Sequence, residues 1–191
     1  MAIAGGGGPV NLVLLGVNSG VNVKRKQSRW KPGMTYAIPL ADGSFGIAQA
    51  GDAMMTNVIY VALFVERYRE LPLPPLPLYA ISAVALAATW RQALNRGEWL
   101  SLSYEPQIFE KTAFPNERFA ESGYVGAKTY DAGILTDFLS AYHGLVPWNV
   151  MHDENFYDQF LLPGVERPRS VVLLDHEARK TYRRESFGVD A

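Results

Sequence analysis

Three histidines, His143, His152 and His176, are the side chains of this 191-residue chain best suited to metal binding or general base catalysis. None stands in the His-x-His or His-Glu-x-x-His spacing of zinc hydrolases. The one local cluster is His152-Asp153-Glu154, and three consecutive side chains point in different directions on a strand or a helix. We therefore expect a solvated loop there, ahead of a helix whose N-terminus favours acidic side chains.

Other catalytic patterns are missing or lack their context. The chain has no cysteine, which excludes disulfides, thiolate metal ligands and cysteine nucleophiles. The segment Gly43–Gly46 does not match the Gly-x-Ser-x-Gly of a nucleophilic serine, and the glycine run Gly5–Gly8 lacks the Lys-Ser of a phosphate loop. We predict no catalytic residues, no metal ligands and no cofactor, and favour a protein that is not an enzyme without excluding one.

The composition indicates a folded domain with little net charge. Hydrophobic residues make up 48%, charged residues 19%, and the formal net charge is -1, so no overall field attracts nucleic acid. The apolar runs are too short to cross a bilayer, and the absence of cysteine favours the cytoplasm. We expect one α+β domain over residues 31–191, after a flexible or extended segment over residues 1–30; the oligomeric state stays open.

An antiparallel hairpin is the clearest local pattern. Strands are predicted at Met34–Leu40 and Ser44–Gln49, because Asp42-Gly43 between them favours a tight turn. Pro39 cannot donate a ladder hydrogen bond, so we expect the first strand to lie at an edge, or to bulge, at that residue. Further strands are predicted at residues 11–17, 57–68, 81–89, 99–104 and 170–174. The alanines of the segment 81–89 also allow a helix there.

Two helices are predicted in the C-terminal part. Residues 130–142 carry apolar side chains at helical spacing between a candidate N-cap, Asp131, and a stop at Gly144, and a second helix is predicted at 154–162. A short helix at 91–96, a proline-rich extended linker at 71–78, an irregular stretch at 107–129 and a helical or extended tail at 177–184 complete the pattern. The predicted fold is α+β, with a twisted, partly open, barrel-like antiparallel sheet and two C-terminal helices packed against it.

Aromatic and acidic side chains mix between Asp131 and Asp158, a composition that suits a protein-binding face. Tyrosine and tryptophan make rigid anchors, and acids steer a basic partner. The alternative is that these aromatics belong to the core; Trp148, in Val146–Asn149, is the one that we most expect to be exposed. The predicted partner-binding residues are Tyr142, Trp148, Asp153, Glu154 and Tyr157.

Two segments resemble a known family. Residues 31–49 combine a Pro-Gly pair, the apolar stretch Tyr-Ala-Ile-Pro-Leu, an Asp-Gly turn and a glycine-containing strand, and this resembles the opening hairpin of the bacterial immunity protein 26 family, also described as phosphotriesterase-associated. Residues 95–99 are similar to that family's Gly-Arg/Glu-Trp before a late strand, and the resemblance covers roughly residues 31–104. It implies a cytoplasmic bacterial protein that binds and neutralises a cognate toxin encoded nearby, with no catalytic residues.

Two other functions stay open at this point. The family's second description implies a small hydrolase acting on phosphotriesters, which would need an activated water. The chain could supply it only if His143 and the segment His152–Glu154 converged with a distant carboxylate such as Asp175. The basic run Lys24–Lys31, which contains Trp30, could contact nucleic acid, although a charged run in a loop is usually only solvated.

Overall fold

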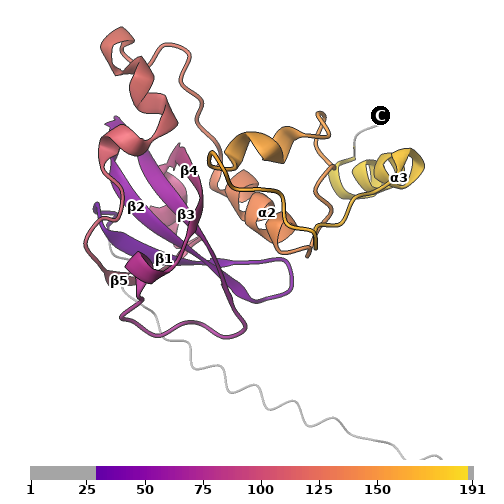
Figure 1. The fold of residues 1–191 in the computed structure, drawn as a ribbon, viewed down its shortest axis with the longest axis horizontal. Helices are drawn as coiled ribbons and strands as arrows, with labels where there is room; N and C mark the ends of the chain where they lie inside the picture. Colours follow the sequence, from indigo (N-terminus) through magenta and orange to yellow (C-terminus); the bar gives the residue numbers. More distant parts are fainter. Residues whose placement is uncertain (1–28, 189–191) are drawn as a thin grey trace, which may run out of the picture.

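A five-stranded antiparallel sheet organises the fold in the computed structural model, which describes residues 29–188 (Figure 1). The predicted α+β class is confirmed, and so are the strands predicted from residue 34 to residue 104; the segment 11–17 lies outside the described residues. The sheet is open, with the order β4-β3-β2-β1-β5. Its strands are β1 Met34–Pro39, β2 Phe45–Met55, β3 Val58–Tyr68, β4 Ala83–Trp90 and β5 Leu100–Tyr104.

Turn chemistry explains why β1, β2 and β3 follow one another as neighbours. In the first turn Gly43 has φ +82°, and the Asp42 carboxylate accepts a hydrogen bond of 3.1 Å from the Ser44 backbone N–H. Asn57, with φ +67°, serves the second turn, since asparagine tolerates the left-handed region. Pro39 pairs with Phe45 of β2 but not with β5, because β5 begins at Leu100, opposite Ala37. The predicted edge position of this proline is therefore confirmed.

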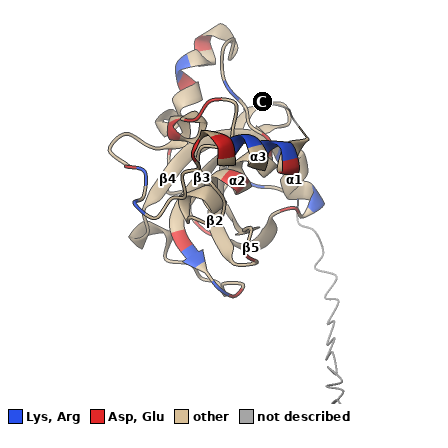
Figure 2. Ribbon diagram, turned by 90° about the vertical axis from the view of Figure 1, so that its right-hand side faces the viewer, with Lys and Arg blue, Asp and Glu red and all other residues tan. Residues whose placement is uncertain are grey.

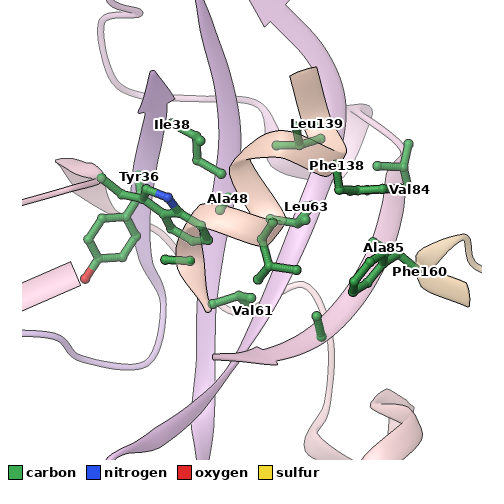
Figure 3. Close-up of a cluster of buried hydrophobic side chains, with 14 of the residues drawn as sticks. Tyr36, Ile38, Ala48, Val61, Leu63, Val84, Ala85, Phe138, Leu139 and Phe160 are labelled. Carbon is green, nitrogen blue, oxygen red and sulfur yellow. The ribbon is translucent and has the colours of Figure 1, made fainter. Parts of the chain in front are cut away.

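Both faces of the sheet are covered by other parts of the chain. One face packs against α2 (Ala132–Tyr142), whose Phe138 and Leu139 lie over Ile38, Leu63 and neighbouring side chains (Figure 3). The opposite face packs against the proline-rich segment and the stretch after β5. Its buried side chains are Ile47, Met54, Val58, Tyr60, Ala62, Phe64, Leu76, Leu78, Leu86, Ala88 and Phe114. Burial on both faces accounts for the nearly continuous apolar run of β3.

Short helices connect the strands. The segment 71–77 contains no helix or strand, as predicted, and leads into the 3-10 helix η1 (Leu78–Ala80). After β4 comes α1 (Arg91–Arg96), which ends at Gly97 with φ +77°, as predicted. The irregular stretch after β5 holds the 3-10 helices η2 (Lys111–Ala113) and η3 (Pro115–Ser122).

The C-terminal part confirms one predicted helix and corrects two other elements. Asp131 caps α2 by accepting from the Gly133 N–H at 2.8 Å. The helix predicted at 154–162 is wrong in type, because only the 3-10 helix η4 (Phe156–Phe160) forms before Pro163 ends it. The strand predicted at 170–174 is also wrong, since its one pairing is an isolated bridge between Val172 and Pro147, away from the sheet.

The last element, α3 (His176–Phe187), lies on the outside of the molecule beyond α2 (Figure 1). It buries no side chain, and Figure 2 shows it as a charged helix, whose basic residues lie between a glutamate near each end. Across residues 29–188, no helix combines the length and the apolar character needed to cross a bilayer.

Candidate functional site

Two of the five side chains predicted to bind a partner are core residues. Trp148 is 0% exposed and Tyr157 is 1% exposed, and both rings contact Phe138 of α2 at centroid distances of 5.7 and 6.0 Å. The expectation that Trp148 is exposed is therefore wrong. Its indole N–H donates to the Asp158 carboxylate at 3.0 Å, and Arg167 binds the same carboxylate while lying over the indole ring. This arrangement satisfies the polar end of a buried tryptophan.

The other three predicted residues do not form one surface cluster of free side chains. Tyr142 is half-buried against the core, whereas Asp153 and Glu154 are exposed. Glu154 pairs with Arg179 of α3 at 2.8 Å, and Asp153 accepts from the Asn155 N–H at 2.9 Å in a local turn. Both acids thus have partners within the chain, which weakens their claim to steer a basic partner.

The three histidines have unrelated surroundings. His143 ends α2 with its Nε2 buried, His152 contacts the Phe156 ring at 5.6 Å, and His176 opens α3 beside Glu177. Burial and the charge of Arg67 lower the pKa of His143. Within residues 29–188, no three His, Asp or Glu side chains gather in a way that could hold a metal ion, so the convergence required by the hydrolase alternative is not found there.

An apolar groove lies between the proline-rich segment and the loop that follows β5. Its volume is about 420 Å³, within the range of ligand-binding clefts. One wall comes from residues 75–79 and the other from residues 105–108, two segments far apart in the sequence. The lining residues are Pro75, Leu76, Pro77, Leu78, Tyr79, Glu105, Pro106 and Ile108. No local sequence pattern predicts that these segments meet.

Both walls of the groove are fastened to the sheet. Leu76 and Leu78 are buried in the apolar cluster beneath the first wall. The second wall is held by Gln49, a buried amide in the middle of β2, whose Nε2 donates to the Pro106 carbonyl oxygen at 2.9 Å and whose Oε1 accepts from the Ile108 N–H at 3.0 Å. A glutamine inside an apolar strand is a sequence signal for such a role, because a buried amide needs partners.

Large apolar side chains are exposed in and beside this groove. Tyr79 is 85% exposed and Tyr104 is 68% exposed, and Leu73 and Ile108 are also accessible. Tyrosines held on fixed backbone are typical anchors of protein interfaces. Glu105 is the one charged residue of the lining; its carboxylate accepts from the Ser103 hydroxyl at 2.9 Å, and no ion pair joins it to a cation in the described part of the chain.

The basic run proposed for nucleic-acid contact is described only at its end. Residues 24–28 lie outside the described residues. Arg29 and Lys31 are exposed, while Trp30 packs against the core and its backbone N–H donates to the Asn95 side chain at 3.1 Å. The aromatic ring of this run therefore has a structural role.

Comparison of the chain with protein-family models, with curated proteins and with solved structures finds no match.

Proposed function

We propose that this protein is an immunity-like binder that neutralises a cognate bacterial toxin in the cytoplasm, and that the groove between residues 75–79 and 105–108 is its contact face. The observation that carries the proposal is an apolar groove with two fastened walls, with the exposed Tyr79 in one wall and the exposed Tyr104 next to Glu105 of the other. Neutralising a toxin by binding needs a rigid surface with anchor side chains and no reaction chemistry. The resemblance of residues 31–104 to an immunity family supplies the biological context.

The charge of the groove defines the chemistry of its partner. Glu105 is the one charged residue of the described groove lining, and none of the ion pairs within residues 29–188 includes it. A partner segment that buries an apolar side chain between the proline-lined walls and places a lysine or arginine beside Glu105 is complementary to it. We therefore commit to an apolar segment with an adjacent cation as the occupant.

The groove is the centre of a larger contact. A stable protein complex buries roughly 1,600 Å² in total, more than one groove offers, and most of the binding energy comes from a few central residues. Tyr79 and Tyr104 hold this central position in the proposal, and the surrounding surface excludes water from them.

The test is co-expression with the protein encoded by the adjacent gene, followed by calorimetric titration of the purified partners. Wild-type protein should form a one-to-one complex. We expect Tyr79→Ala and Tyr104→Ala each to weaken binding by about ten-fold or more, as removal of an interface anchor does. Leu173→Ala is the matched control, because Leu173 is also an exposed apolar side chain but neither lines the groove nor adjoins a lining residue in the chain.

The charge of Glu105 is tested in the same complex. Glu105→Gln should weaken binding and reduce its sensitivity to salt, whereas Glu98→Gln, at an exposed acid outside the groove, should leave both unchanged. A complex that tolerates all the groove substitutions would move the contact face elsewhere. Absence of any complex with the neighbouring protein would remove the proposed function itself.

A further inference from the structure

A second cavity, of about 170 Å³, lies beside the outer edge of β4. Two other segments cover this edge at separate points: the Leu162 N–H donates to the Val84 carbonyl oxygen at 3.0 Å, and the Tyr130 N–H donates to the Ala88 carbonyl oxygen at 2.9 Å. Between these points, residues 86–88 form the floor of the cavity, and side chains from η3 and η4 form its walls. The fold thus leaves an opening at an edge that it otherwise closes.

The polar side chains of this cavity are cationic or neutral. Arg118 and Lys128 supply two positive charges, and Asn116, Tyr130 and Gln159 supply amide and hydroxyl groups. Among residues 29–188, no aspartate, glutamate or histidine lines the cavity. The described lining therefore carries two positive charges and no negative one.

Neither cation is neutralised by an ion pair within residues 29–188. Lys128 Nζ donates to the neutral Gln159 Oε1 at 3.0 Å, and the Arg118 guanidinium lies over the Phe119 ring at 4.7 Å. Glu117, next to Arg118 in the chain, accepts a hydrogen bond of 2.6 Å from the hydroxyl of Tyr60, which lines the cavity, and its charge is balanced by an ion pair with Lys111.

The backbone around the cations is held in place. Asn116 is buried, its Nδ2 donates to the Lys128 carbonyl oxygen at 2.7 Å, and its Oδ1 accepts from the Lys128 N–H at 3.3 Å. These two hydrogen bonds join the start of η3 to the segment that carries Lys128. The two cations therefore approach the cavity from two segments that a buried amide fixes to each other.

We infer that this cavity binds one phosphate group, either as the free ion or on a small ester. Two positive charges and the absence of acids suit a doubly charged oxyanion, and arginine matches its geometry with paired N–H donors. The volume is too small for a nucleotide, since clefts for ligands of that size begin at roughly 300 Å³. Phe119 and Pro115 at the wall favour an ester with an apolar or aromatic group beside the phosphate.

The test is a titration of the purified full chain with inorganic phosphate, phenyl phosphate and acetate, followed by NMR. Phosphate should shift the backbone signals of residues that line the cavity, and tighter binding of phenyl phosphate would assign the group to an ester. We expect Lys128→Met and Arg118→Gln each to weaken binding by about five-fold or more, as loss of a charge-assisted hydrogen bond does. Lys31→Met, at an exposed lysine outside the cavity, should bind as wild type does.

Three results would overturn the inference. The first is no response of the cavity signals to either phosphate compound while thermal melting shows each protein to be folded. The second is equal weakening by Lys31→Met, which would mean general attraction to surface charge. The third is binding of acetate as tightly as phosphate, which would replace the phosphate with a single carboxylate.

Discussion

At the scale of single residues, His143 is a titratable group whose surroundings oppose its charged form. It follows α2, and its Nε2 is buried with no hydrogen-bond partner among residues 29–188. Burial and then the positive charge of Arg67 lower its pKa, while the negative charge of Asp42 acts in the opposite direction. In the unfolded chain a histidine has a pKa of about 6.5, so the unfolded state takes up the proton first as the pH falls. The stability that neutral His143 contributes above that pKa is therefore lost as the pH falls below it.

A pH comparison tests this linkage. The urea midpoint of the wild-type protein should fall between about pH 7.5 and about pH 5.5, values that bracket the ordinary histidine pKa. His143→Gln should show a smaller fall, because glutamine does not titrate. His176→Gln should behave as the wild type does, since the His176 side chain is 79% exposed. An unchanged fall in His143→Gln would assign the acid sensitivity to other groups.

The exposure of the predicted partner-binding residues was the hardest part to predict from the sequence. Trp148 stands between Pro147 and Asn149, which is typical of an exposed loop, yet distant groups enclose it. The Asn149 side-chain amide donates to the Leu174 carbonyl oxygen and accepts from the Leu174 backbone N–H. The Trp148 backbone N–H donates to the Val172 carbonyl oxygen at 2.8 Å. These contacts join residues more than twenty positions apart, and no local pattern encodes them.

At the scale of elements, the alanines of β4 reflect close packing and not helix propensity. Ala85 is fully buried, pairs with Leu63 of β3 and lies next to Phe160 of η4 (Figure 3). A larger side chain at this point would push η4 away from the sheet. Ala85→Leu should therefore lower the free energy of unfolding by about 1 to 3 kcal/mol, measured by chemical denaturation. Ala83→Leu, at a half-buried position in the same strand, should cost less than about 1 kcal/mol, and equal losses would contradict tight packing at Ala85.

Elements with strong local signals could be predicted, and those without them could not. Asp42-Gly43 fixed the first hairpin, and Asp131 with Gly144 bounded α2, because turn and cap chemistry acts within a few residues. The 3-10 helix η4 has apolar side chains at spacings that also suit an α-helix, so the pattern predicted the buried residues Tyr157 and Phe160 but not the helix type. The bridge at Val172 depends on Pro147, a partner far along the chain.

At the scale of the whole molecule, both candidate sites arise where segments distant in the sequence meet. The groove joins residues 75–79 to residues 105–108, and the cation-lined cavity joins η3 and η4 to the edge of β4. Local strand and helix patterns indicated the α+β class, and the apolar run of β3 fits a strand buried on both faces of a sheet. The sites depended instead on how the connections cross the sheet, which side-chain periodicity does not specify.

The exposure of α3 predicts that the rest of the described structure unfolds cooperatively without it. No side chain of α3 is buried, and Arg179 joins the helix to the rest through Glu154 and the carbonyl oxygens of Met151 and His152. Ending the chain after Leu174 should therefore keep a single cooperative thermal transition followed by circular dichroism, with a loss of about 1 to 2 kcal/mol.

A longer truncation supplies the contrast, and it follows from the surroundings of Trp148. Ending the chain after Gly164 also removes Arg167 and Val172, which bind Asp158 and the Trp148 backbone. The fully buried indole would then lose part of its enclosure, so we expect the near-ultraviolet signal and the cooperative transition to be lost. If removal of α3 alone produced the same loss, the helix would belong to the cooperative unit in spite of its exposure. Retention of the transition in both truncations would instead confine that unit to the sheet and α2.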